Sequence, residues 1–278
     1  MERNCMEVGM PLRALDSHCH ADHLQKNTVD FPDIYLRDQI AAISWSYLQE
    51  VNSYLEYSVA WYNQEQTCAT LSGFAVPFFY LVGIHPRSIA QDFPSFNYLP
   101  KDVLRALQRH ASNPNCLGLG ELGLESGDEK EKQILYLQLQ WARDNLPANK
   151  RIGIHTPRRD KAQITRLILE ILEDFPSLQD CVVIDHVQSE NLQMLLPAKY
   201  NLGMTLQEGK VSISELKSLI NNNPGLDKRV MLNSDSLHSL SRPYLQMTAD
   251  RGILTSVRED LLLNNALNFY DLPKTWKG

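Results

Sequence analysis

Histidines and acidic residues are concentrated near the start of the chain. The stretch Ala14–His23 (ALDSHCHADH) holds three histidines and two aspartates directly behind an apolar start. Imidazole and carboxylate groups together suit Zn²⁺, Mn²⁺, Fe and similar divalent ions. A metal site needs further ligands elsewhere in the chain, whereas a polar loop needs none. The stretch by itself is therefore compatible with both, and the rest of the sequence has to decide.

Residues of the same kinds follow other short, apolar, β-rich runs. They are Asp16, His18 and His20 in the first run, His85 in the third, Glu121 and Glu125 in the fourth, His155 in the fifth, His186 in the sixth, and Asn233 and Asp235 in the eighth. So many histidines and carboxylates at separate strand ends favour a metal site. By contrast, His23, His110 and His238 lie outside these strand ends, and we expect them to be solvated.

Alternation of side chains along a strand gives the first run an orientation. His18 and His20 share one face, and Cys19 points to the opposite face, which removes its thiol as a ligand. Asp16 has the same parity as the histidines and lies one step deeper. We expect its carboxylate to accept an imidazole N–H and to hold a ring in place.

The elements that must position these residues alternate along the chain. Eight β-rich runs (13–20, 41–47, 78–86, 115–125, 151–157, 181–187, 200–207 and 229–235) are separated by segments with helical character (53–71, 100–111, 129–146, 161–175, 190–198 and 213–223). This order predicts a parallel sheet closed into a (β/α)8 TIM barrel, in a single domain over residues 1–278. One extra helix is expected over 256–273, with Ser256 as its N-cap and an end before Pro273.

The barrel prediction explains why the polar residues follow the strands. Active sites of such barrels lie at the carboxyl ends of the strands, where all eight runs end together. A doubly wound open sheet is the alternative architecture. It is disfavoured because the glycine-rich phosphate-binding turn after the first strand is absent.

Composition narrows the class of protein. The 278 residues include 27 Lys and Arg against 33 Asp and Glu, a net charge of −6. That balance argues against a broad basic surface for duplex nucleic acid, because such binding rests on neutralised phosphates. A compact phosphate site remains possible where metal ions supply positive charge.

Location and redox state are also predicted. No run of about 18 apolar residues and no secretory signal are present, which indicates a cytoplasmic protein without a membrane span. The five cysteines, Cys5, Cys19, Cys68, Cys116 and Cys181, are odd in number and form no CxxC pair. We expect free thiols.

Taken in order, the motifs resemble those of the TatD family of metal-dependent hydrolases, a branch of the amidohydrolase-like barrels. "DSHCHAD" is similar to the family's D-x-H-x-H, "GIHP" to its G-x-H-P, and "GLGELGLE" to its G-E-[IL]-G-L-[DE]. "IGIHTPRR" and "VVIDHV" resemble its two later histidine strands, and "NSD" stands at its terminal aspartate. The resemblance spans nearly the whole chain, and the ordered set is specific although each motif alone is not.

The resemblance implies a site with one or two divalent ions, of Zn, Mn, Mg or Fe. Carried over position by position, the implied ligands are His18, His20, Glu121, His155, His186 and Asp235. It further implies that Glu121 bridges two ions, and that His85 and Glu125 contact substrate or support the ligands. Where TatD nucleases carry Glu-Thr before the final aspartate, this chain has Asn233 and Ser234, which sets it closer to TatD-related hydrolases of unassigned substrate.

The leading hypothesis is hydrolysis by metal-activated water, with Glu121 and Asp235 as catalytic residues and Asp235 as proton acceptor. Arg158 and Arg159 follow His155 and are candidates to bind a substrate phosphate or carboxylate, although solvated loop arginines are an equal interpretation. A phosphoester is the favoured substrate, either in DNA or in a small nucleotide-like molecule.

Two alternatives remain open from the sequence. An amidohydrolase would use the same activated water to attack a C–N bond. A metal-binding scaffold protein would keep the fold without turnover. The case for nucleic acid as a partner is weak, no membrane partner is expected, and the sequence does not indicate the oligomeric state.

Overall fold

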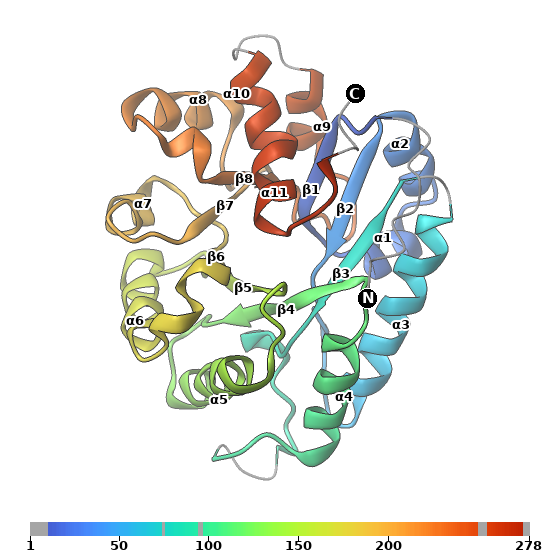
Figure 1. The fold of residues 1–278 in the computed structure, drawn as a ribbon, viewed down its shortest axis with the longest axis vertical. Coiled ribbons are helices and arrows are strands. Elements are labelled where there is room, and N and C mark those ends of the chain that lie inside the picture. The colour runs from blue at the N-terminus through green and yellow to red at the C-terminus, as the bar shows by residue number, and fades with distance from the viewer. Residues whose placement is uncertain (1–10, 74–75, 94–96, 250–254, 275–278) are drawn as a thin grey trace. The chain divides into compact units, whose positions relative to one another are not determined.

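The structure is a computed structural model that describes residues 11–73, 76–93, 97–249 and 255–274. Strands and helices alternate along the chain from β1 to α11 (Figure 1). This order confirms the predicted (β/α)8 TIM barrel. The chain divides into two compact units: the first comprises residues 1–44, 66–79 and 201–278, and the second residues 45–65 and 80–200. The expectation of a single domain stays a prediction.

The first unit holds both ends of the chain. Its strands are β1 (Ala14–Cys19), β2 (Ile40–Ser44), β7 (Asn201–Thr205) and β8 (Val230–Asn233). Its helices are α1 (Ala21–Asn27), α2 (Phe31–Arg37), α8 (Ile213–Asn222), α9 (Arg242–Ala249), α10 (Thr255–Glu259) and α11 (Asn265–Phe269). β1 pairs with β2 and β7 with β8, all parallel, and β1 also packs beside β8.

The second unit carries the middle of the chain. Its strands are β4 (Cys116–Gly123), β5 (Arg151–His155) and β6 (Val182–Ile184), and its helices are α4 (Lys101–Ala111), α5 (Glu129–Asn145), α6 (Lys161–Glu173) and α7 (Ser189–Leu195). The boundaries between the units fall inside α3 (Glu56–Ser72) and β3 (Phe78–Val82). The last residues of β3 pair with β4, β4 with β5 and β5 with β6, again all parallel.

Strand residues are buried on both faces, as expected where helices cover a parallel sheet. Every residue of β1, β2, β4 and β8 is buried, including the polar ones. Glycines permit the closest approach between β4 and β5: a Cβ on Gly118 (φ +149°) would lie 1.9 Å from the Arg151 carbonyl oxygen. The glycines of the GLGELG run therefore let the strand that carries Glu121 lie against the strand that carries His155.

Several local expectations differ from the structure. Helices α1, α2 and α9 were not predicted, and His23 lies in α1 instead of a loop. The C-terminal helix is present as α10, a π-helical segment over 260–264 and α11. Ser256 is its second described residue instead of its cap. α2 and α9 each have a proline in the second position, a helix-start signal, but helices of this length depend on tertiary packing more than on local signals.

Two remaining expectations concern buried groups. The prediction that His110 is solvated is wrong: it is 1% exposed, and the Tyr80 hydroxyl lies 3.1 Å from its Nδ1. Burial lowers the pKa of His110 to about 4. Cys19, Cys68, Cys116 and Cys181 are free thiols as predicted, and Cys5 lies outside the described residues. None of the described helices combines the length and the apolar character that a membrane span needs.

Candidate metal centre

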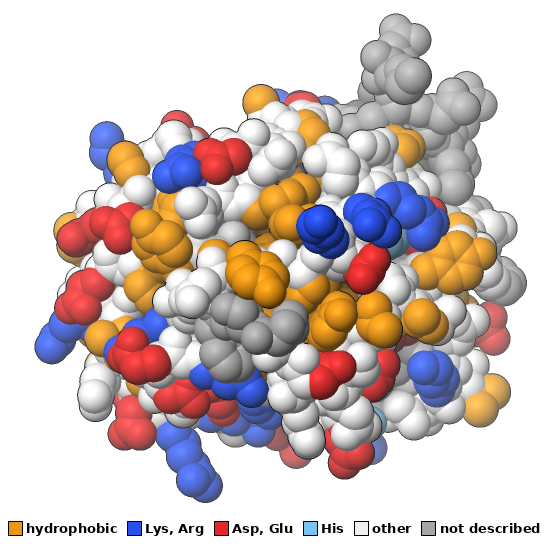
Figure 2. All heavy atoms as spheres, turned by 90° about the horizontal axis from the view of Figure 1, so that it is seen from below, with side chains coloured by type: hydrophobic (Ala, Val, Ile, Leu, Met, Phe, Trp, Pro, Cys, Tyr) orange, Lys and Arg blue, Asp and Glu red, His pale blue; other side chains and the backbone are white. Residues whose placement is uncertain are grey.

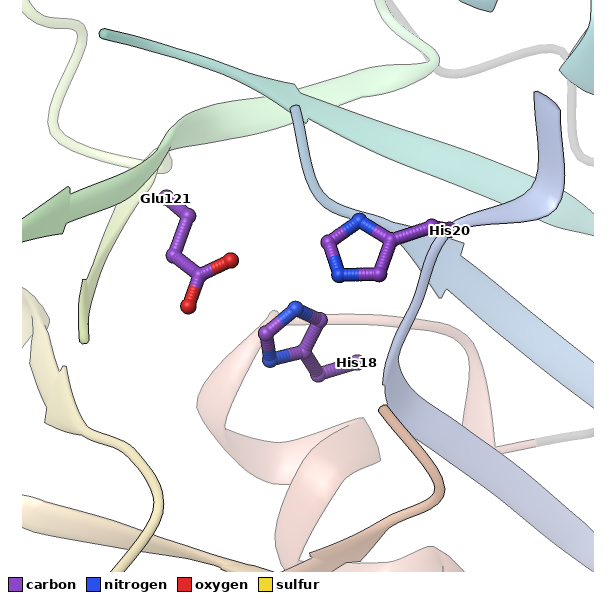
Figure 3. Close-up of side chains that lie close together, drawn as sticks. All are labelled: His18, His20 and Glu121. Carbon is purple, nitrogen blue, oxygen red and sulfur yellow. The ribbon is translucent and has the colours of Figure 1, made fainter. Parts of the chain in front are cut away.

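In the second unit, three imidazole rings lie close to one carboxylate oxygen of Glu121. Oε1 of Glu121, on β4 (Figure 3), lies 2.6 Å from His155 Nδ1, 3.1 Å from His186 Nε2 and 3.6 Å from His85 Nε2. All four side chains are almost completely buried. Side-chain nitrogen or oxygen atoms of His85, Glu121 and His155 all lie within 4.8 Å of one another. Of this cluster, the Glu121 carboxylate and the His155 and His186 imidazoles are the groups that suit a divalent ion.

His85 belongs to this cluster as a hydrogen-bond donor. Its Nδ1 accepts the backbone N–H of Arg87 at 3.0 Å, so that nitrogen carries no proton. Burial lowers the pKa of His85 to about 4, which keeps the ring neutral and places its single proton on Nε2. A protonated nitrogen cannot ligate a metal. Nε2 is buried and has no hydrogen-bond partner among the described residues, so its N–H remains for an incoming oxygen.

His155 joins two carboxylates. Its Nδ1 contacts Glu121, and its Nε2 lies 2.9 Å from Glu125 Oε2. Burial acts to lower the pKa of His155, but the charges and hydrogen bonds of Glu121 and Glu125 raise it overall. The converse holds for Glu125: burial raises its pKa, and His155 with Arg87 lowers it to about 2. The two carboxylates therefore favour a positive charge at the His155 ring.

Further side chains border the cluster at Glu125. Arg87 Nε lies 3.7 Å from Glu125 Oε2, and its guanidinium stacks over the Tyr47 ring at 5.3 Å. The Tyr47 ring meets the His85 ring edge-on at 5.1 Å. The loop after Glu125 is tied down by Glu131, whose carboxylate accepts the backbone N–H groups of residues 125–127 at 2.8–3.1 Å. Glu125 is therefore held by its backbone as well as by its charge partners.

His186 comes from the end of β6 in an unusual backbone conformation. Its φ is +57°, in the left-handed region that non-glycine residues seldom adopt. The ammonium of buried Lys161 donates to the His186 carbonyl at 2.9 Å and to the Thr156 hydroxyl at 3.1 Å. Thr156 in turn donates to the Asp185 carbonyl at 2.7 Å. These bonds hold the residues beside His155 and His186 together at the ends of β5 and β6.

The first unit has a second group of ligand atoms. His18 lies on β1 and His20 directly follows it, and their ring centroids are 4.9 Å apart (Figure 3). Asp235 follows β8, and its Oδ1 lies 3.1 Å from His20 Nε2 and 3.7 Å from His18 Nε2. The backbone fixes this approach, because Asp235 N–H donates to the His18 carbonyl and His20 N–H to the Ser236 carbonyl, both at 2.9 Å. Two imidazoles and a carboxylate oxygen again suit a divalent ion.

Asp235 also has a cationic neighbour that the sequence did not reveal. The ammonium of Lys210, in the loop after β7, donates to Asp235 Oδ2. From the same loop, Gln207 donates to the Asp235 carbonyl at 3.2 Å. A rule that inspects every loop after a strand would have included Lys210, but such a rule cannot separate it from a solvated lysine. The same limit applies to Arg87, Tyr47, Glu131 and Lys161.

The expected role of Asp16 is wrong. Its oxygens accept the Tyr35 hydroxyl at 2.6 Å and the Ser234 N–H at 2.9 Å instead of an imidazole N–H. The register of β1 against β2 shifts between Asp16 and Cys19, so simple alternation does not carry from Asp16 to His18. Burial raises the pKa of Asp16 to about 6.

Asn233 and Ser234, which precede Asp235, make hydrogen bonds to neighbouring segments. Asn233 accepts a hydrogen bond from the Thr205 hydroxyl at 2.8 Å, which joins β8 to β7. Ser234 binds Asp16 through its N–H and the Ser236 N–H through its hydroxyl. Arg158 and Arg159 are exposed, in the loop before α6.

Comparison with known proteins identifies the family of the chain. The TatD related DNase family matches residues 15–271. The chain belongs to this family. An uncharacterized metal-dependent hydrolase, MJ0761, of Methanocaldococcus jannaschii is 30% identical over 203 residues, which are 69% of this chain and 73% of that protein. Membership makes the protein a TatD-family metal-dependent hydrolase.

Solved structures show the same fold. The TatD-like protein AF1765 of Archaeoglobus fulgidus is 27% identical, with a TM-score of 0.71 over 93% of this chain and all of that one. A manganese complex of 5-carboxyvanillate decarboxylase from Novosphingobium aromaticivorans is 12% identical, with a TM-score of 0.56 over 96% of this chain and 97% of that one. The second likeness concerns the fold alone. Together with the element order, these structures identify the (β/α)8 barrel.

Proposed function

We propose that this TatD-family member hydrolyses a phosphoester of a small, nucleotide-like substrate. The observation that carries this proposal is the buried Glu121 oxygen, which lies 2.6 Å from His155 Nδ1 and 3.1 Å from His186 Nε2, a donor set that suits a divalent ion. The proposed metal ligands are His18, His20, Glu121, His155, His186 and Asp235. Their combination in one centre rests on the barrel fold, in which the carboxyl ends of the strands share a rim.

A divalent ion bound by these residues supplies an activated water near neutral pH and polarises the ester. The protein's own residues do the rest. Asp235 takes the proton of the attacking water and returns it to the leaving oxygen. Water adds OH to phosphorus, the P–O bond to the leaving alcohol breaks, and the alcohol leaves with the proton. His85 donates its Nε2–H to a substrate oxygen, in agreement with its fixed tautomer.

In this proposal, arginines bind the negative charge of the substrate, and Glu125 offsets part of their positive charge. Arg87 lies beside the cluster, and Arg158 and Arg159 follow β5 at the surface; a guanidinium binds phosphate oxygens in a fork. We include Arg158, Arg159, His85 and Glu125 among the substrate-binding residues. Substituting Arg158 or Arg159 by alanine would then raise KM more than it lowers kcat.

Surface charge favours a small substrate over duplex DNA. On the face seen in Figure 2, Lys and Arg side chains are interspersed with Asp and Glu and with hydrophobic groups. The net charge of −6 agrees with this distribution. A broad basic track for the DNA backbone is therefore unsupported on that face. Cytoplasmic action is part of the proposal, since the described cysteines are free thiols.

The test is a substrate panel with Mn²⁺, Zn²⁺ or Mg²⁺ added to the metal-free protein. Phosphate release from small phosphomonoesters or nucleotides, absent in E121Q, is the expected result. Release of ammonia or a free carboxylate from amides would instead support the amidohydrolase alternative. Stoichiometric metal without turnover on any ester or amide would support the scaffold alternative, and digestion of DNA in preference to nucleotides would restore the nuclease reading.

A further inference from the structure

Lys210 places a buried positive charge inside a group of metal ligands. Its side chain is 6% exposed, and its ammonium contacts Asp235 Oδ2. Charged lysines are seldom buried without a partner of opposite charge, because desolvation of an ammonium is costly. Neither the family motifs nor the proposed reaction assigns a role to this lysine.

Hydrogen bonds anchor the loop that carries Lys210, so the fold positions Lys210 next to Asp235. Lys210 N–H donates to the Gln207 carbonyl at 3.0 Å, and Val211 N–H to the Thr205 carbonyl at 3.1 Å. The Ser241 hydroxyl donates to the Leu206 carbonyl in the same loop. Gln207 holds the backbone of Asp235 while Lys210 holds its carboxylate. A solvated lysine would have no such support on both sides.

The two oxygens of Asp235 are divided between different neighbours. Oδ1 faces His20 at 3.1 Å and His18 at 3.7 Å, whereas Oδ2 faces Lys210. Only Oδ1 is therefore positioned to share an ion with the imidazoles. Lys210 can stay on Oδ2 while an ion occupies Oδ1, and the two positive charges then repel across one carboxylate.

The neighbours of the other carboxylate are different. Glu121 Oε1 faces the imidazoles of His155 and His186, which can themselves ligate an ion. The ammonium of Lys210 has no lone pair and cannot ligate an ion. At Asp235 the ammonium already balances the carboxylate.

We propose that Lys210 weakens divalent-ion binding by His18, His20 and Asp235, so that this group holds the more exchangeable ion. This inference rests on the proposed metal centre and describes how its occupancy is regulated. Occupancy of the site at His18, His20 and Asp235 follows the metal concentration, while the ion at Glu121, His155 and His186 is retained. Lys210 is a positioning residue, since it acts on the ion through Asp235.

The experiment is a calorimetric Mn²⁺ titration of the full-length, metal-free protein, with bound metal counted after equilibrium dialysis. Wild type is compared with K210M, with K210R, which keeps the charge, and with K199M, which removes an exposed lysine. We expect a weaker binding step in wild type that tightens at least about tenfold in K210M. The tighter step should not change, and K210R and K199M should match wild type.

If wild type shows one step only, K210M should gain a second. D235N should abolish the weaker or gained step, which assigns it. The inference is overturned if K210M titrates like wild type, if both steps tighten equally, or if K210R tightens as much as K210M. A wild-type protein that binds no Mn²⁺ at all would instead overturn the proposed metal centre, so the two failures are distinguishable. Near-ultraviolet circular dichroism of each variant verifies that it is folded.

Discussion

The two groups of ligand atoms differ in how their carboxylates are balanced. In the second unit, one oxygen of Glu121 is met by His85, His155 and His186. In the first unit, Asp235 shares its oxygens between two histidines and Lys210. The chemical types are alike, but an ammonium contacts the carboxylate of one group, whereas imidazoles approach the carboxylate of the other. Ligand identity alone therefore does not set metal affinity; the surrounding charge does.

The largest expected effect is on activity. Glu121→Gln removes the carboxylate that three imidazoles approach, and we expect kcat/KM for the substrate found in the panel to fall by at least about a thousandfold. Asp235→Asn should cost less, about a hundredfold, because the Glu121 carboxylate and its imidazoles stay in place. Steady-state kinetics at saturating Mn²⁺ measures both. Equal losses in the two variants would contradict the difference drawn between the groups.

The second-largest expected effect is a loss of thermal stability when the metal is removed. An ion that binds only the folded state at a thousand times its Kd stabilises by about 4 kcal/mol, or roughly 10 °C in Tm for a chain of this length. EDTA should lower Tm by that order, and His155→Ala should shrink the shift. Differential scanning fluorimetry with and without EDTA checks it. Identical melting of EDTA-treated and metal-replete wild type would rule out the metal centre.

In the metal-free protein, replacing Asp235 should cause a smaller loss of unfolding free energy. Asp235→Asn leaves the Lys210 ammonium without its carboxylate, which should cost about 3 kcal/mol of unfolding free energy. The double variant with Lys210→Met should recover much of this loss, because no charge then stays buried. Urea unfolding of the four proteins gives the coupling energy. Strictly additive losses would show that the ion pair contributes nothing.

The smallest expected effect is on how stability depends on pH. The pKa of His85 is lowered to about 4 in the folded chain, against an ordinary value of 6.5, so the unfolded chain binds more protons between these values. Stability from this group is complete above pH 6.5 and is lost as pH falls toward 4. From pH 7 to 5, metal-free wild type should lose about 2 kcal/mol more than His85→Gln.

Comparison with His85→Gln is needed because His155, whose pKa is raised, contributes with the opposite sign. Urea unfolding at the two pH values is the measurement. If wild type and His85→Gln lose the same free energy, His85 is not held neutral by burial, and its assignment as a hydrogen-bond donor is wrong.

Much of the architecture was predictable because its signals are local. Seven of the eight β-rich runs contain their strand, β2 begins one residue before its run, and helices α3 to α8 fall within or next to the predicted segments. The short helices α1 and α2 were missed because helices of 7 residues rely on packing more than on propensity. His110 was misassigned because a histidine at a helix end is equally compatible with water and with a buried tyrosine hydroxyl.

The sequence by itself determined which chemical groups are available at the strand ends, namely histidines and carboxylates. Together with the alternating strand and helix patterns, these residues predict a barrel enzyme that uses divalent metal. Tertiary structure decided which nitrogen of His85 carries the proton, why Asp16 turns to Tyr35, and that Lys210 balances Asp235. Hydrophobic periodicity is a property of neighbouring residues, whereas these hydrogen bonds and charge pairs depend on groups from separate elements and loops meeting at specific distances. Only the folded chain brings those groups together.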